Sequence, residues 1–189
     1  MMTVRAEAVA ATRARILDAA YDLSAERDFA DVPLSDLAER AETTVQTILR
    51  HFATKGGVVD AVIRRESARV MAEREQVPVG DLDAVTGYLA RHYAQQGDAV
   101  LAMLAAERRS EAAGQAVANG RRLHREWVAR TFAPWLEGLS AAARRRRLEQ
   151  LVAATDVYTW KLMRRDGGLE DRQYRLAVRE LLTAIEGAR

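Results

Sequence analysis

The chain has 189 residues, of which 49% are hydrophobic and 30% charged, and its formal net charge is +2. These values are typical of a globular protein with one or two domains. The absence of cysteine excludes disulfides, thiolate metal sites and cysteine nucleophiles. No apolar run has the length of a signal peptide or a membrane span, so we expect a cytoplasmic protein without a membrane partner.

Good helix formers dominate the sequence, and β-branched residues nowhere alternate as they do in a strand, so we predict an all-α protein. After a polar, alanine-rich arm at residues 1–12, apolar residues recur at helical spacing from Arg13. Pro33 suits the first turn of a second, short helix, because its missing N–H would be unpaired there anyway. A third short helix ends near Phe52, and a longer one covers residues 58–75.

The clearest linker signal is the segment 77–81, in which Asp81 is a good N-cap for the helix that follows. Glycines separate the helical segments beyond it. The apolar spacing predicts five further helices, at about residues 82–95, 98–110, 115–137, 141–165 and 169–187.

The third helix is free of negative charge, although its surroundings are not. Residues 1–55 contain seven Lys and Arg against nine Asp and Glu, yet no acidic residue lies between Thr43 and Lys55. A helix in the DNA major groove must present hydrogen-bonding groups and avoid carboxylates. An ordinary amphipathic surface helix would have a similar pattern, so this pattern alone leaves both interpretations open. The residues expected to face outward are Thr43, Thr44, Gln46, Thr47, Arg50 and His51, with Lys55 just beyond them.

Each outward side chain suits a contact with DNA. Gln46 could pair with adenine, and Arg50 with guanine or a phosphate. The threonines could contact a phosphate or a thymine methyl group. His51 would either contact a phosphate or pack beside Phe52.

A series of segments with fixed spacing spans about residues 13–63. Its members are Arg15 to Ala20, Phe29, Leu37 to Ala41, Thr47 to Phe52, and Lys55. This series resembles the N-terminal domain of the TetR family of transcriptional regulators. The resemblance implies a three-helix DNA-binding head, nine or ten helices in all, a dimeric C-terminal domain and ligand-controlled repression. It also makes Lys55 similar to a phosphate-clamping lysine, the alternative being a solvated side chain.

The head departs from the family pattern at four places. Glu42 occupies the position of the glycine in the turn, and Val32-Pro33 replaces a hydroxyl pair that usually caps the second helix. Leu49 replaces a tyrosine that usually contacts phosphate, and Asp28 replaces the glycine before the aromatic residue. Each lost phosphate contact would make DNA binding less dependent on salt, by about 0.9 log units. We therefore expect weaker binding to the DNA backbone than is usual in the family.

The last two predicted helices carry more apolar surface than one core requires. The segment Ala154 to Leu162, with Arg164, Arg165 and Asp166, also resembles a segment of actinobacterial-looking family members. We expect these helices to form a four-helix bundle with those of a second copy, as the resemblance also implies. The alternative is a monomer with a thicker core. The residues expected in the dimer interface are Leu151, Thr155, Tyr158, Leu162, Tyr174, Val178, Leu181, Leu182 and Ile185.

Aromatic and soft side chains concentrate between residues 88 and 135, with a few polar groups among them. Such a set is typical of a small-molecule pocket, and equally of an ordinary core. We expect an apolar or aromatic effector there. The residues expected to line its pocket are Tyr88, His92, Met103, Glu107 and Trp127.

The sequence thus predicts an all-α fold of nine helices. Three form a helix-turn-helix DNA-binding domain in residues 1–55, and six form a ligand-binding and dimerisation domain in residues 56–189. The expected function is that of a repressor that binds palindromic double-stranded operator DNA as a homodimer and is released by a small-molecule effector. We expect no cofactor, metal site or catalytic residue.

Two other classes of protein compete with this interpretation. One is a dimer of the same fold that has lost operator binding and binds a ligand or a protein instead. The other is an enzyme, which is disfavoured because the three histidines lack ligand spacing and no phosphate-binding glycine loop is present.

Overall fold

The computed structural model describes residues 2–109 and 111–187, which form ten α-helices and no strand. The chain divides into two compact units, residues 1–69 and residues 70–189. Helix α4 (Lys55–Glu75) begins in the first unit and ends in the second. No helix in the described ranges is long and apolar enough to cross a membrane.

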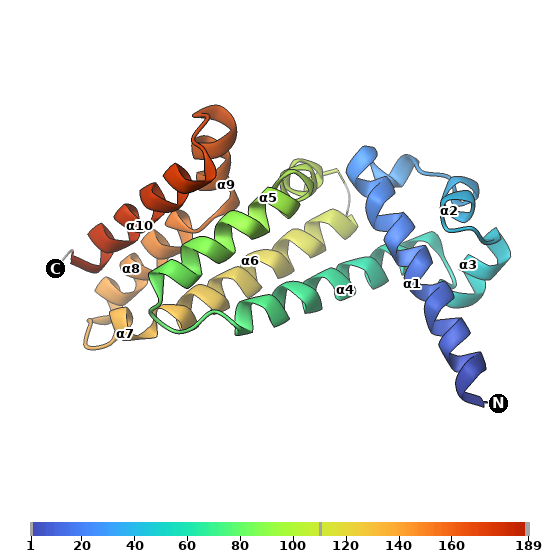
Figure 1. Ribbon diagram of the computed structural model, residues 1–189, viewed down its shortest axis with the longest axis horizontal. Helices are drawn as coiled ribbons and strands as arrows, with labels where there is room; N and C mark the ends of the chain where they lie inside the picture. The colour runs from blue at the N-terminus through green and yellow to red at the C-terminus, as the bar shows by residue number, and fades with distance from the viewer. Residues whose placement is uncertain (1, 110, 188–189) are drawn as a thin grey trace. The chain divides into compact units, whose positions relative to one another are not determined.

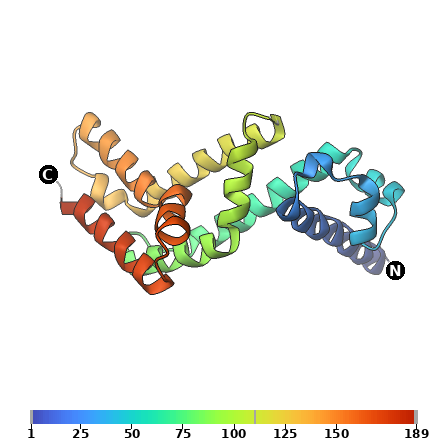
Figure 2. The same cartoon turned by 90° about the horizontal axis from the view of Figure 1, so that it is seen from above.

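The first unit is a small bundle, in which α2 packs against both α1 and α3 (Figures 1 and 2). Its core is fully buried and comes from all four helices, for example through Ile16, Leu37, Ile48 and Val58. Helix α1 begins at Met2, so the N-terminal arm predicted for residues 1–12 is helical from its second residue; its alanines are strong helix formers. The elements before α4 are α1 (Met2–Glu26), the 3₁₀ turn η1 (Phe29–Asp31), α2 (Leu34–Arg40) and α3 (Val45–Phe52).

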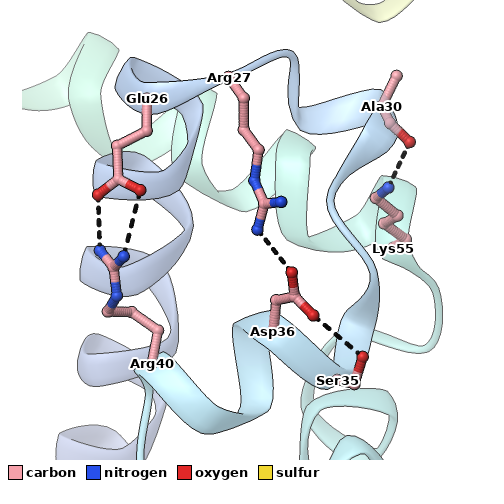
Figure 3. A network of polar contacts seen from close by, with 7 residues as sticks. All are labelled: Glu26, Arg27, Ala30, Ser35, Asp36, Arg40 and Lys55. Carbon is pink, nitrogen blue, oxygen red and sulfur yellow. Dashed lines mark hydrogen bonds and ion pairs between the residues drawn. The ribbon is translucent and has the colours of Figure 1, made fainter.

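Two ion pairs join α2 to the end of α1 (Figure 3). The guanidinium of Arg40 donates to both carboxylate oxygens of Glu26, at 2.9 and 3.2 Å, and this hydrogen bonding lowers the pKa of Glu26. Arg27 donates to Asp36 at 2.6 Å. Because these pairs are exposed, they orient the helices more than they stabilise them.

The second unit is a larger helical bundle. Helix α10 packs against α5 and α8, and α6 packs against the same two helices (Figures 1 and 2). Its core is rich in aromatic residues, of which Trp127, Phe132 and Tyr174 are almost completely buried. The elements after α4 are α5 (Leu82–Ala106), α6 (Glu111–Thr131), α7 (Ala133–Leu136), α8 (Ala141–Ala154), α9 (Val157–Trp160), the π-helical segment η2 (Lys161–Asp166) and α10 (Asp171–Gly187).

The second unit contradicts three of the predicted helix boundaries. Helix α5 continues through Gly97, where the sequence suggested a break, because the ring of Trp160 occupies the space of the missing side chain. The helix predicted for residues 115–137 divides into α6 and α7, with Pro134 in the first turn of α7. The next predicted helix ends at Ala154, after which the carboxylate of Asp156 caps α9. The described chain therefore has ten helices rather than nine.

Candidate functional site

The turn between α2 and α3 forces one residue into the left-handed region. The N–H of Thr43 donates to the carbonyl of Ala38 at 2.9 Å, and the N–H of Glu42 donates to the carbonyl of Glu39 at 3.1 Å. This double hydrogen bond is a Schellman motif, which requires a left-handed residue at the position of Glu42. Glu42 has a φ of 49°. The glycine expected from the family resemblance is therefore replaced by a residue that the turn strains.

We expect Glu42→Gly to raise the free energy of unfolding by about 1 kcal/mol, because glycine adopts the left-handed conformation without a steric penalty. Chemical denaturation of the full chain measures this change. The matched control is Glu39→Gly, at an exposed position with helical backbone inside α2. That variant should lose about 1 kcal/mol. Equal effects of the two substitutions would contradict the assignment of strain to Glu42.

Helix α3 begins at a side-chain cap. The hydroxyl of Thr44 accepts the N–H of Thr47 at 3.1 Å and lies 3.0 Å from the hydroxyl of Thr47. These two threonines are thus engaged with each other, and Thr43 is half-buried. Gln46 and Arg50 are exposed and line a shallow hollow on the surface of α3, together with Val45 and Leu49. Leu49 is 39% exposed, so the tyrosine position of the family pattern presents an alkyl group to solvent here.

Two of the predicted DNA-contacting residues have additional roles within the head. The ammonium of Lys55 donates to the carbonyl of Ala30 at 2.7 Å (Figure 3) and lies 5.4 Å from the centre of the Phe29 ring. Lys55 therefore joins the start of α4 to η1, and its ammonium group is engaged within the first unit rather than only solvated. His51 is half-buried beside Phe52, and its carbonyl accepts from Arg13 at 3.2 Å.

The predicted effector-lining residues divide into two groups. The rings of Tyr88 and His92 stack at 5.2 Å between centroids, and the rings of Tyr88 and Trp127 lie 5.4 Å apart. Glu107 instead forms an exposed ion pair with Arg121, which lowers its pKa mainly through a hydrogen bond. Met103 is 37% exposed. The structure therefore brings three of the five residues into one buried cluster. The other two lie at the surface, because they are near the C-terminal end of α5, where the side chains are partly or fully exposed.

Around these aromatic rings lies a buried polar core, which we define as Arg74, Tyr88, His124 and Thr155. Arg74 donates through Nε to the hydroxyl of Tyr88 at 3.1 Å and through Nη2 to Nδ1 of His124 at 3.2 Å. Nε2 of His124 lies 3.2 Å from the hydroxyl of Thr155. Nothing in the sequence marks Arg74 as buried, because it lies in a charged segment that is typical of a solvated helix end.

The protonation state of His124 follows from its partners. Because Arg74 can only donate, Nδ1 of His124 accepts, and the ring proton is on Nε2. That proton is donated to the hydroxyl of Thr155, which donates in turn to the carbonyl of Leu151 at 2.8 Å. Burial, together with the charge of Arg74, lowers the pKa of His124 to about 3. His124 is therefore neutral at physiological pH.

This depressed pKa predicts a loss of stability on acidification. Between pH 6.5 and 3 the unfolded chain binds a proton at His124 and the folded chain does not, so the free energy of unfolding falls as the pH falls. The contribution between pH 7 and pH 5 is about 2 kcal/mol. Chemical denaturation at both pH values measures the loss. Between pH 7 and pH 5 the free energy of unfolding should fall by about 2 kcal/mol less in His124→Gln than in the unmodified chain. Identical pH profiles would contradict the assigned pKa.

The predicted dimer-interface residues also divide into two groups. Five of them are buried in the core of their own protomer and cannot contact a second copy: Leu151, Thr155, Tyr174, Val178 and Leu182. The helical stripe that suggested an interface is, at these positions, the face that α8 and α10 turn to the core. Ile185 is half-buried. Tyr158, Leu162 and Leu181 are exposed, and so is Leu176, which was not among the predicted interface residues.

Comparison with known proteins identifies the N-terminal unit. Residues 16–62 match the family described as bacterial regulatory proteins, tetR family. The chain is 35% identical over 71 residues to the uncharacterized HTH-type transcriptional regulator YvkB of Bacillus subtilis (strain 168). This match covers 38% of the chain and spans 37% of the length of that relative.

Solved structures resemble nearly the whole chain. Salmonella enterica GusR matches with a TM-score of 0.69 and 19% identity, over 94% of this chain and 96% of its own. A transcriptional regulator from Rhodococcus sp. Rha1 matches with a TM-score of 0.70 and 15% identity, over 92% and 95% of the two chains. At these identities the likeness is one of fold. The comparisons therefore show that residues 16–62 form a DNA-binding domain of the tetR family of bacterial regulatory proteins, and that the chain as a whole has the fold of these solved structures.

Proposed function

We propose that the chain is a transcriptional repressor that binds a palindromic DNA operator as a homodimer in the cytoplasm and is released by a small apolar or aromatic effector. The observation that carries this proposal is the outer surface of α3. Gln46 and Arg50 are exposed beside a shallow hollow, and no acidic residue lies between Thr43 and Lys55. The DNA major groove admits one α-helix, and these two side chains suit bidentate contacts with adenine and guanine.

A selection of bound sequences from random double-stranded DNA, carried out at low salt with the full chain, tests the proposal. We expect enrichment of a palindrome whose half-sites are centred about one helical turn, roughly 34–36 Å, apart. A pool that stays random at low salt would contradict operator binding. Low salt is essential because weak contacts with phosphates are lost first as the salt concentration rises.

The homodimer is the second part of the proposal, and exposed apolar side chains near the C-terminus support it. Leu162 of η2 is 63% exposed and Tyr158 of α9 is 53% exposed, while α10 adds Leu181 at 40%. Large apolar side chains that are exposed in neighbouring elements are typical of an interface. Helices η2 and α10 pack against each other, so these side chains belong to one region of the second unit.

We expect light scattering to give about twice the chain mass of 21.0 kDa for the unmodified protein. Leu162→Glu should raise the dissociation constant of the dimer at least about thirtyfold, because it places a charge in an apolar contact. The control is Val79→Glu, at an equally apolar and exposed position in the linker before α5. A monomeric unmodified chain, or dissociation by the control as well, would contradict this interface.

Three features of the N-terminal unit favour the alternative function, a dimer of the same fold without operator binding. Lys55 is engaged with Ala30, and the exposed Glu42 brings a carboxylate to the turn before α3. Pro33 precedes α2 without a side-chain cap, so no hydroxyl is available there for a phosphate. The low-salt selection separates the two functions, because the alternative predicts no enriched sequence at any salt concentration.

A further inference from the structure

The second unit buries a positive charge without a negative one. Arg74 is 5% exposed, and its guanidinium contacts the hydroxyl of Tyr88, the imidazole of His124 and, at 5.1 Å, the ring of Trp127. None of the ion pairs among the described residues includes Arg74. Since His124 must accept from Arg74, it is neutral and supplies no counter-charge. A buried guanidinium with only neutral partners is costly, and an anion would remove most of that cost.

The guanidinium also has unused hydrogen-bonding capacity. It carries five N–H donors in a planar arrangement, and the described hydrogen bonds of its side chain use one at Nε and one at Nη2. Nη1 and the second N–H of Nη2 together present the geometry that binds both oxygens of a carboxylate. Arg74 is thus equipped for an anion that the protein itself does not provide.

Independent support comes from four buried polar atoms that lack any hydrogen-bond partner among the described residues. They are Nε1 of Trp127, Oγ1 of Thr131, Nε1 of Trp160 and Oη of Tyr174. The two indole groups can only donate, so an acceptor atom would be needed to satisfy each of them, and the indole of Trp127 lies beside Arg74. Native proteins keep few such groups, and each calls for an explanation such as a ligand or a bound water.

Helix geometry brings part of this set next to Arg74. His124, Trp127 and Thr131 are spaced three and four residues apart on α6, so they share one face of that helix. Arg74 contacts two of them, and Tyr88 packs against Trp127 from α5. One cation, unsatisfied donors and aromatic rings therefore meet in a single region of the second unit.

We propose that this polar core binds the effector, and that the effector is an organic acid whose single carboxylate pairs with Arg74 while its apolar or aromatic body packs on Tyr88 and Trp127. The proposal rests on the proposed function in assigning an effector to this unit. A monoanion is favoured over a phosphate, because the apolar surroundings would have to strip the hydration shell from a more strongly charged group.

The test compares acids with their amides, which have nearly the same shape and no charge. Benzoate, 2-naphthoate and octanoate are each titrated against benzamide, 2-naphthamide and octanamide, using the full chain without DNA. Tryptophan fluorescence and thermal shift report binding. We expect at least one acid to bind about tenfold or more tightly than its amide, as a charge-assisted hydrogen bond implies. If no acid is preferred over its amide, the proposal is overturned.

Variants then identify Arg74 as the origin of the preference. Arg74→Met should bind the preferred acid and its amide equally, and its melting temperature without ligand should rise, because a buried unpaired charge is removed. Arg74→Lys keeps the charge and should keep part of the preference, which serves the test if Arg74→Met does not fold. Arg122→Met, at an exposed arginine of α6, should keep the full preference. A preference that survives in Arg74→Met would overturn the proposal.

These outcomes are separable from those of the proposed function, because no DNA is present in the titrations. A chain that fails the DNA selection can still prefer the acid. A chain that binds an operator but shows no preference for any acid would refute only the effector class.

Discussion

Replacing both Gln46 and Arg50 with alanine is expected to abolish sequence-specific DNA binding while leaving the dimer intact. Each bidentate contact with a base is worth about 1–3 kcal/mol of discrimination, so the two substitutions together should weaken specific binding about a hundredfold or more. Both side chains are exposed on α3, and neither contributes to the core of the head. Fluorescence anisotropy with the selected operator measures the loss, and light scattering measures the dimer.

The single variants separate base recognition from backbone contact. If Arg50 pairs with guanine, Arg50→Ala should relax specificity at one base position. If Arg50 contacts a phosphate, the substitution should weaken binding to all sequences. The slope of the logarithm of the binding constant against the logarithm of the salt concentration should then fall in magnitude by about 0.9. Arg125→Ala is the control, because it removes the same charge from an exposed position on α6 in the other unit. An unchanged footprint in the double variant would show that α3 is not the recognition helix.

The second large effect is expected at Gly97, in the middle of α5. A Cβ atom there would lie 2.4 and 2.6 Å from two ring atoms of Trp160, which is 2% exposed and cannot move without disturbing the core. Gly97→Ala should therefore lower the free energy of unfolding by about 3 kcal/mol, the upper part of the range for overpacking a core. Chemical denaturation of the full chain measures this loss.

Gly120 provides a matched control for Gly97. It also lies inside a long helix, α6, but a Cβ atom there has no neighbour within 4 Å. Gly120→Ala should raise the free energy of unfolding by about 0.5–1 kcal/mol, because alanine is the better helix former and nothing obstructs it. Were Gly97→Ala as stable as Gly120→Ala, the contact between Gly97 and Trp160 would not exist as described.

The head was largely predictable because its elements are defined by local signals. Apolar spacing located α2 and α3, Thr44 caps α3, and Glu42 occupies the left-handed position of the turn that its alignment with a family glycine had indicated. What could not be predicted was the hydrogen bond between Lys55 and Ala30, since the two residues are brought together by the packing of separate elements. Lys55, which the sequence suggests is solvent-facing, therefore joins two elements of the first unit.

The second unit was less predictable, because residues far apart in the sequence decide which of its side chains are buried and which are exposed. The sequence predicts a dimer interface at the stripe that includes Leu151, Tyr174 and Leu182, but α5, α8 and α10 bury this stripe within one protomer. Glu107 was expected in a pocket and pairs with Arg121 at the surface instead. Helical periodicity identifies an apolar face without specifying whether the same chain or another one covers it.

By itself the sequence determined the all-helical fold, the presence of a helix-turn-helix within residues 1–55 and the absence of acidic residues on α3, because periodicity, capping and charge are properties of neighbouring residues. Only the tertiary structure decided that α5 runs unbroken past Gly97 and that Arg74 is buried beside His124. Both outcomes depend on contacts between helices far apart in the chain. Because of these contacts Arg74, which the sequence places in a segment typical of a solvated helix end, is buried among neutral partners.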